Sequence, residues 1–327
     1  MGEDALRERL LTRLGEPMGG SGPTVAPDPV NLPMIRHWVD ALDDRNPIYL
    51  DEEAAARSRF GQIVAPPAML QTWTMSRPRI EGIAERGGAP GDIDPDSPLA
   101  LLAGAGFTGT LATNSELTFN RYLRLGDHLT STTLFDEISE LKQTALGLGY
   151  FVTWALIYTD QTGEEVGRQL FRIFRFDPTK AGAASRSGKR EPRPEPQILE
   201  ELPPLKVDLT ASVIVAGAIA SQDFMPAHHD RDFAQAQGAP DLFMNILTSN
   251  GYVARYVTDW AGPEAKLQTM AIRLGGPACP GHVLAFSGGV TGRRREGDED
   301  VIEVTLQAVT GLGQHVSGTV VLSLPPC

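Results

Sequence analysis

The sequence predicts an α+β protein in which one chain contains two similar units, each an antiparallel sheet wrapped around one buried helix. Three observations support this. A short motif at residues 223–230 recurs in altered form at residues 44–51. An apolar segment with helical spacing follows each copy, and each half of the chain ends in two β-rich runs separated by a turn. A Pro-rich stretch separates the two copies, as expected of two domains joined by a linker.

The two motif copies read DFMPAHHD at 223–230 and DRNPIYLD at 44–51. Both have aspartate first, proline fourth and aspartate last, whereas His228 of the later copy is replaced by Tyr49 in the earlier one. An alanine follows each closing aspartate by four positions, and a glycine comes next. A repeat much longer than the roughly 20–50 residues of a solenoid unit indicates a duplicated domain.

In the first unit, Pro66 and Pro67 precede an apolar segment that we expect to form the buried helix; it contains Met69, Leu70 and Trp73. Residues 87–109 are rich in Gly, Asp and Pro and predict a long loop. β-Branched and aromatic residues then predict two antiparallel strands, at 150–158 and 169–176, joined by a turn at 160–163.

Residues 181–206 are expected to form the linker between a first domain at 1–180 and a second domain at 207–327, because Ala, Gly, Ser, Arg, Glu and Pro replace apolar periodicity there. The second domain repeats the pattern of the first. A helix is predicted after a start signal at Pro240 and Asp241. Its apolar face comprises Phe243, Ile246, Leu247, Asn250, Val253, Ala254 and Val257. Strands are predicted at 301–309 and 315–324.

Composition narrows the function classes. The formal net charge of −12 argues against a nucleic-acid surface, which needs clustered Lys and Arg. The two cysteines, Cys279 and Cys327, provide no disulfide framework and favour a reducing compartment. The first thirty residues lack the continuous apolar core of a secretory signal, and no window reaches the length of a membrane span. We therefore expect a cytoplasmic protein without a nucleic-acid or membrane partner.

The spacing Asp-x-x-Pro-x-His-x-Asp, followed by a glycine and a buried helix, resembles the MaoC family of (R)-specific enoyl-CoA hydratases. This resemblance implies a double hotdog fold in which only one hotdog keeps the Asp and His, so the first unit would be the non-catalytic one. Residues 241–253 and 255–260 further resemble the catalytic subunit of the steroid side-chain hydratases of bacterial cholesterol degradation. Those enzymes pair two separate hotdog subunits, and this chain resembles their single-chain fusion.

Three positions depart from the family pattern: Gln222 replaces a glycine, Met225 replaces an asparagine, and Asn245 stands about where a glycine opens the helix.

Hydration of a double bond conjugated to a thioester needs a base for water, an acid for the α-carbon and donors for an enolate-like oxygen. Asp223 and His228 are the candidate catalytic groups for proton transfer. The backbone N–H groups of Asn245 and Ile246, at the positive end of the helix, are the candidate oxyanion donors. The candidate substrate-binding residues are His229, Ser249, Asn250 and Arg255.

No cofactor or metal is expected, because the CoA thioester is itself the substrate and Cys279 and His282 are too few ligands for zinc. Asp51 and Asp230 are expected to cap short helices rather than to do chemistry. For His229 a structural or exposed role is favoured over a catalytic one. For Ser249 and Asn250, hydrogen bonding within their own helix and contact with substrate are both open. Arg255 and Arg273 are candidates for CoA phosphate contacts.

Two other functions stay open at this point: a non-catalytic acyl-CoA-binding scaffold that assists another enzyme, and a hotdog acyl-CoA thioesterase. We expect the acyl-CoA to be bulky, with a steroid as the leading hypothesis, and the protein to form a homodimer. An aldolase or thiolase of the same pathway is a possible further partner.

Overall fold

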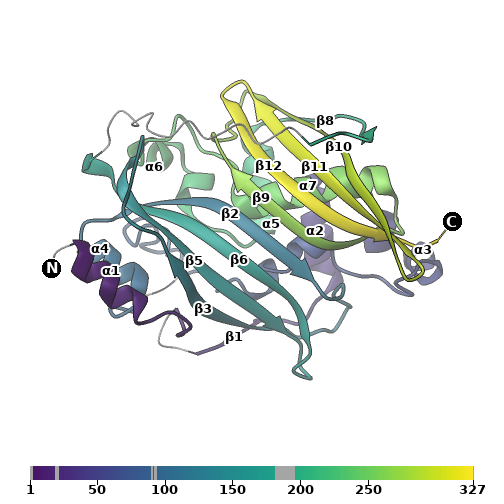
Figure 1. Ribbon diagram of the computed structural model, residues 1–327, viewed down its shortest axis with the longest axis horizontal. Helices are drawn as coiled ribbons and strands as arrows, with labels where there is room; N and C mark the ends of the chain where they lie inside the picture. Colours follow the sequence, from purple (N-terminus) through teal and green to yellow (C-terminus); the bar gives the residue numbers. More distant parts are fainter. Residues whose placement is uncertain (1–2, 19–21, 90, 92–93, 181–195, 327) are drawn as a thin grey trace.

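The computed structural model describes residues 3–18, 22–89, 91, 94–180 and 196–326. The strands form one sheet (Figure 1). Those of the first half are β1 (Thr24–Val25), β2 (Gly109–Phe119), β3 (Thr130–Ile138), β4 (Lys142–Thr144), β5 (Gly147–Thr159) and β6 (Glu165–Asp177). Those of the second half are β7 (Glu200–Glu201), β8 (Leu205–Asp208), β9 (Lys266–Leu274), β10 (Val283–Glu296), β11 (Glu299–Thr310) and β12 (Gly313–Leu324).

The two halves share one continuous sheet, with the order β1-β3-β5-β6-β2-β9-β12-β11-β10-β7. The joint is the antiparallel pair β2–β9, in which Asn114 lies opposite Arg273 and Thr118 opposite Thr269. The α+β double hotdog prediction is therefore confirmed at the level of fold class, but the expectation of two separate sheets is wrong. Pairing β2 with β9 satisfies the backbone groups of two edges that would otherwise be exposed.

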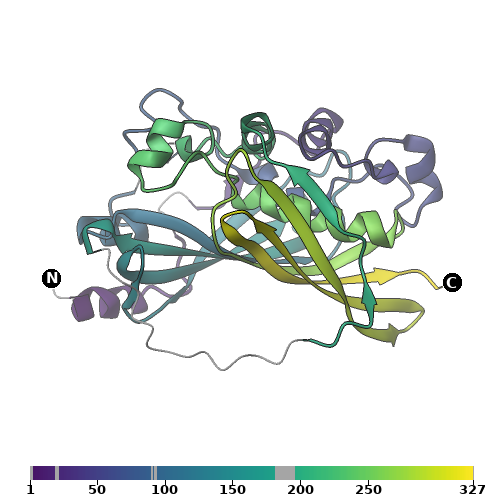
Figure 2. The ribbon, with the colours of Figure 1, turned by 90° about the horizontal axis from the view of Figure 1, so that it is seen from above.

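The helices that surround the motif copies cover one face of this sheet, as Figure 2 shows for α2, α3, α5, α6 and α7. Their bounds, with the other helices and single 3₁₀ turns, are α1 (Glu3–Leu11), α2 (Leu32–Leu42), η1 (Pro47–Tyr49), α3 (Glu52–Arg57), η2 (Pro67–Met69), η3 (Thr72–Thr74), α4 (Pro98–Gly104), η4 (Pro178–Lys180), α5 (Ala211–Ala220), η5 (Pro226–His228), α6 (Arg231–Ala236) and α7 (Ile246–Ala261).

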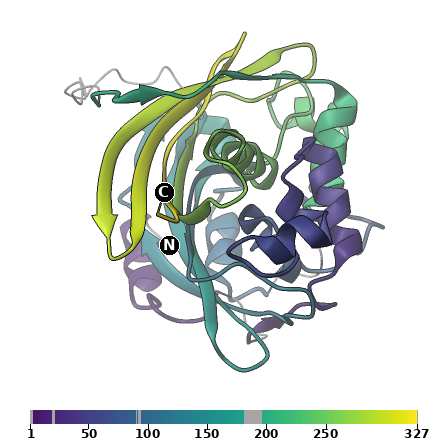
Figure 3. The same ribbon diagram turned by 90° about the vertical axis from the view of Figure 1, so that its right-hand side faces the viewer.

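The helix predicted in the second half is α7, around which the sheet curls in Figure 3. Its predicted start at Pro240 and Asp241 is wrong, since the first helical residue is Ile246. Asn245 has extended backbone angles (φ −77°, ψ 165°), and its side-chain oxygen accepts a hydrogen bond from the Thr248 N–H. This residue is therefore the N-cap of α7. Phe243 consequently lies before the helix.

The buried helix predicted in the first half does not form. The segment after Pro66 instead contains two single 3₁₀ turns, η2 and η3, and Met75 leaves the second turn in an extended conformation (ψ 130°). The apolar residues of this segment are still buried, with Met69 at 0 % and Trp73 at 2 % exposure. Part of their packing comes from α7, which contacts η2 across the boundary between the halves. One long helix thus serves both halves.

The strand predictions are confirmed, because the four expected runs lie inside β5, β6, β11 and β12. The predicted loop at 87–109 contains a helix, α4, which Ser97 caps through the Ala100 N–H. Residues 181–195 of the predicted linker lie outside the described residues. The rest of it includes β7 and the start of β8, both of which pair with β10, so this part of the segment belongs to the sheet.

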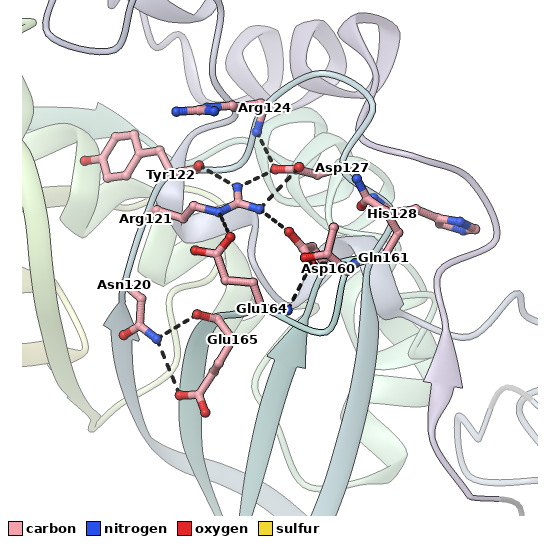
Figure 4. Close-up of polar contacts among 11 residues, drawn as sticks. Asn120, Arg121, Tyr122, Arg124, Asp127, His128, Asp160, Gln161, Glu164 and Glu165 are labelled. Carbon is pink, nitrogen blue, oxygen red and sulfur yellow. Dashed lines mark hydrogen bonds and ion pairs between the residues drawn. The ribbon is translucent and has the colours of Figure 1, made fainter.

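A cluster of charged side chains connects two loops of the first half through ion pairs (Figure 4). Arg121 forms ion pairs with Asp127 at 2.6 Å and with Asp160 at 2.7 Å, and it lies 3.4 Å from Glu164. Hydrogen bonds from Thr162, supported by the Glu164 N–H and Arg121, lower the pKa of Asp160 to about 2. The cluster therefore joins the loop after β2 to the turn between β5 and β6.

Candidate functional site

Each motif copy follows a helix that ends in the same way. Asp43 after α2 and Gln222 after α5 have left-handed backbone angles, with φ values of 51° and 59°. The next residue is the motif aspartate, and its N–H reaches back five positions: Asp44 to the Val39 carbonyl and Asp223 to the Ala218 carbonyl. Such a left-handed helix C-terminus usually has glycine at the position that Asp43 and Gln222 occupy here. It turns the chain so that each aspartate begins the motif loop.

The Asp223 carboxylate is held by two donors. Its Oδ1 accepts a hydrogen bond from the Met225 N–H at 3.2 Å, and its Oδ2 accepts one from the Asn245 side-chain amide at 3.0 Å. The same amide donates to the Ser221 hydroxyl at 2.8 Å. About 18 % of the Asp223 side chain remains exposed, so the carboxylate is fixed in place and still accessible.

The His228 ring lies in η5 with its two nitrogens in different surroundings. Nδ1 is 2.7 Å from the Phe243 carbonyl, and because a carbonyl only accepts, Nδ1 carries the proton. In the neutral ring Nε2 then has the lone pair, and it lies 3.5 Å from Asp223 Oδ2. This distance exceeds that of a direct N–O hydrogen bond, so one water can bridge the two atoms. The sequence-predicted pair is thus brought together.

The N-terminus of α7 lies beside this pair, since Asn245 both caps the helix and contacts Asp223. In the part of the chain that the structure describes, the N–H groups of Asn245 and Ile246 donate to no backbone carbonyl. The first N–H groups of a helix point outward along its axis and carry its positive partial charge. These two candidate oxyanion donors therefore lie near the predicted proton-transfer groups.

Buried polar contacts of Ser249 and His315 lie next to Asn245. The Ser249 hydroxyl contacts the Asn245 carbonyl at 3.0 Å and His315 Nε2 at 2.9 Å. His315 Nδ1 donates to the Gly276 carbonyl, and burial lowers the pKa of His315, so in the neutral ring Nε2 is an acceptor. The single Ser249 hydroxyl proton can therefore go either to the Asn245 carbonyl or to His315 Nε2. Ser249 therefore packs under the helix start.

The remaining substrate-binding candidates have protein partners. Asn250 is buried and donates to the Ser115 hydroxyl of β2 at 3.2 Å. Arg255 donates to the Leu42 carbonyl at 2.6 Å and pairs with Asp259 at 3.2 Å. His229 is exposed, and its Nε2 lies 3.2 Å from the Phe224 carbonyl. For all of these residues, contact with substrate stays a prediction.

The first motif copy keeps the frame without the imidazole. Asp44 Oδ1 accepts from the Asn46 N–H at 3.0 Å, as Asp223 Oδ1 does from Met225. Asp44 is only 5 % exposed, and this burial raises its pKa to about 6. Tyr49 occupies the position of His228 and is 2 % exposed. This copy is a packed structural element.

The equivalence of the copies extends to the helices that follow. Asp51 caps α3 through the Glu53 and Ala54 N–H groups, and Asp230 caps α6 through the Phe233 N–H. Both predicted capping roles are confirmed. Among the described residues, no group of three or more His, Cys, Asp and Glu side chains has a metal-binding arrangement, and no helix there is long and apolar enough to cross a membrane.

A cavity of about 180 Å³ lies where the first half meets the second motif loop. The first half supplies Met34 of α2, Thr72 and Trp73 of η3, and Met75 after it; the second half supplies Gln222, the residue before Asp223. Arg77, Asp28 and Pro27 complete the lining. Apolar, polar and charged side chains thus line the cavity together, and Gln222 connects it through the chain to the candidate pair.

Sequence reasoning missed the partners that position Asp223 and His228. The Asn245 side chain is both the cap of α7 and the donor to Asp223. The signal that could have located this cap is the residue type, because asparagine is a preferred residue at helix starts. The Phe243 carbonyl and His315 carried no recognisable signal, because long-range folding alone brings them to the site.

Comparison with known proteins finds similarity to dehydratases and to hydratase subunits. Residues 20–169 match the family model "FAS1-like, dehydratase domain region". The chain is 46 % identical over 123 residues to the beta subunit of the 3-oxo-4,17-pregnadiene-20-carboxyl-CoA hydratase of Mycobacterium tuberculosis. This match covers 38 % of this chain and 92 % of that subunit. It is 43 % identical over 169 residues to the alpha subunit of that enzyme, which covers 51 % of this chain. The chain spans about half the length of the alpha subunit (50 %).

Solved structures agree on the fold. A MaoC-like dehydratase superposes with a TM-score of 0.71 at 19 % identity, covering 97 % of this chain and 100 % of the other. A conserved hypothetical protein of Mycobacterium tuberculosis, described as having a double hotdog fold, superposes with a TM-score of 0.61 at 12 % identity. That match covers 95 % of this chain and 96 % of the other. At these identities the likeness concerns the fold alone.

Proposed function

The chain belongs to the MaoC-like dehydratase family, and on this premise we propose that it is an enoyl-CoA hydratase whose second half adds water across the 2,3-double bond of a bulky, steroid-type enoyl-CoA. The observation that carries the proposal is the approach of His228 Nε2 to Asp223 Oδ2 at 3.5 Å, beside the start of α7. A carboxylate and an imidazole at this separation can hold one water between them.

In the proposed reaction, the bridging water donates one hydrogen bond to Asp223 and one to His228 Nε2. Its oxygen bonds to the β-carbon while Nε2 takes its proton, and the π electrons of the double bond move toward the thioester oxygen. The N–H groups of Asn245 and Ile246 stabilise the resulting enolate oxygen, each contributing on the order of 3 kcal/mol. The proton gained by His228 is then available for the α-carbon, which completes the addition of H and OH.

The proposed acyl group extends toward the first half. The replacement of a central helix by the two short turns η2 and η3 favours a large acyl group there. Relatives of this chain include both subunits of a hydratase named for a pregnadiene carboxyl-CoA, which supports a steroid substrate and a single-chain counterpart of that pair. Homodimer formation, a cytoplasmic location and an aldolase or thiolase partner stay predictions.

The test compares two readouts on purified protein. With a steroid enoyl-CoA, wild type should lose the enoyl-thioester absorbance without releasing CoA thiol, and His228→Ala should reduce this rate at least a hundredfold. His37→Ala, which removes an exposed imidazole of α2, is the matched control and should stay within threefold of wild type. Thiol release would identify a thioesterase instead. Tight acyl-CoA binding without either reaction would identify a scaffold protein.

A further inference from the structure

The two motif copies hold their loops by different means. In the first copy Asn46 caps η1, since its side-chain oxygen accepts a hydrogen bond from the Ile48 N–H at 3.3 Å. Met225 takes the equivalent place in the second copy, and η5 has no side-chain cap. The loop that carries the candidate pair has therefore lost a local anchor that the loop without the imidazole has kept.

A segment of the first half lies against Met225. A Cβ atom placed on Gly88 would come 1.8 Å from Met225 Sδ and 3.2 Å from its Cε, so the glycine backbone packs directly on the thioether. Gly88 also has φ +89°, in the region that favours glycine. The close contact thus depends on the absence of a side chain at residue 88.

The segment that presents Gly88 is internally braced. The Gly88 N–H donates to the Ile83 carbonyl at 2.8 Å, and Ile83 is buried. The Arg86 guanidinium donates to the carbonyls of Arg79, Glu81 and Ala89. A braced turn can hold a flexible methionine side chain in one place, whereas a mobile one could not.

Met225 is in turn connected to the candidate carboxylate, because its N–H donates to Asp223 Oδ1. We propose that Met225 is a positioning residue: the first half, through Gly88, holds the Met225 side chain and thereby fixes the loop from Asp223 to His228. Packing between the halves replaces the asparagine cap of the other copy. This inference rests on the proposed function for its kinetic consequence, but its structural part does not.

The experiment uses Gly88→Ala with Gly87→Ala as a matched control. Both glycines have positive φ, +89° and +64°, so alanine strains the backbone at either site, but only at Gly88 would its Cβ meet Met225. Gly88→Ala should lower kcat about tenfold with KM within twofold, since a misplacement of about 1 Å can cost roughly a hundredfold. Gly87→Ala should leave kcat within twofold.

Rescue separates positioning from general damage. Met225→Asn shortens the side chain and restores the local cap seen at Asn46, so Gly88→Ala in that background should change kcat by less than twofold. An equal loss of kcat in Gly87→Ala and Gly88→Ala would overturn the proposal, as would an unchanged kcat in Gly88→Ala or a full tenfold loss in the Met225→Asn background.

Amide hydrogen exchange provides a readout that needs no turnover. Gly88→Ala should speed exchange in the peptide covering residues 223–228 at least threefold, while Gly87→Ala should not. If the wild type proves unable to hydrate any enoyl-CoA, the proposed function fails, yet this exchange pattern still decides whether Gly88 fixes the loop. Unchanged exchange in Gly88→Ala would reject the positioning role itself.

Discussion

Asp43 and Gln222 occupy equivalent places in the two halves and share a left-handed backbone conformation, with φ of 51° and 59°. They are the only non-glycine residues with positive φ in the described part of the chain. Each ends a helix and precedes the aspartate of its motif copy. The duplication has therefore preserved a strained turn even where the side chains differ, which indicates that the turn itself aims the motif loop.

Gln222→Gly should stabilise the protein. Glycine removes the clash of a left-handed residue, worth about 1–2 kcal/mol, and loses part of that gain to the greater freedom of the unfolded chain. The expected net gain is on the order of 0.5–1 kcal/mol in the free energy of unfolding, measured by urea denaturation. A lower unfolding midpoint would show that the Gln222 side chain contributes more than the strain costs.

Asp44→Asn should also stabilise the protein, with a defined pH dependence. The pKa of Asp44 is raised to about 6 from 3.8 by burial, so its ionised form destabilises the fold fully above pH 6, and this cost fades as the pH falls toward 3.8. Asparagine keeps the acceptor for the Asn46 N–H. At pH 8 the variant should gain on the order of 2–3 kcal/mol.

At pH 4 the stability gain of the Asp44→Asn variant over wild type should fall below about 1 kcal/mol, because Asp44 is then almost fully protonated in the folded state and about half protonated in the unfolded state. A constant difference between the variant and wild type across this pH range would contradict the burial account of Asp44.

Asn245→Asp should separate the two roles of this residue. Aspartate caps a helix about as well as asparagine, so at a pH low enough to protonate this buried carboxyl the free energy of unfolding should change by less than about 1 kcal/mol. The variant cannot donate to Asp223 Oδ2 and places a second carboxylate beside it. Hydration should fall roughly a hundredfold, and the acid limb of the pH–rate profile should move to higher pH. Full activity would show that the contact is dispensable.

Arg121→Leu should destabilise the first half by leaving Asp127 and Asp160 without their shared cation. The loss should be on the order of 2 kcal/mol at pH 7, below that of a fully buried pair because 21 % of the Arg121 side chain is exposed. The lowered pKa of Asp160 means that its contribution is present above about pH 4 and is lost as the pH falls toward 2.

The control for this prediction is Arg168→Leu, which removes a solvent-exposed pair with Glu165. Its unfolding midpoint should stay close to that of wild type. Equal losses in both arginine variants would mean that the Arg121 cluster is no more than another surface ion pair.

The motif residues and the β-rich runs were predictable because their signals are local. Spacing alone selected Asp223 and His228 as candidates, which the structure brings within 3.5 Å of each other, and alternation with turn residues located the strands of both halves. The buried helix of the first half was predicted wrongly. Its segment is apolar and buried, as a central helix would be, but it forms two 3₁₀ turns that pack against α7 of the other half. Packing across a domain boundary leaves no local signal in the sequence.

The same reason explains what was missed at the site. The pairing of β2 with β9, the contact of Gly88 with Met225 and the support of Ser249 by His315 each join residues distant in the sequence. A single sequence reports such contacts only through residue types, and glycine, methionine and histidine each fit many other environments. The departure of Met225 from the family pattern was visible, but its partner was not.

The most direct measurement compares Asp223→Asn with Asp44→Asn, the same substitution at equivalent positions of the two halves. The initial rate of steroid enoyl-CoA hydration is followed for both variants and wild type at one pH. The proposed function predicts a loss of at least a hundredfold in Asp223→Asn and a rate within threefold of wild type in Asp44→Asn. Retained hydration in Asp223→Asn, or equal loss in both variants, would contradict the assignment of catalysis to the second half.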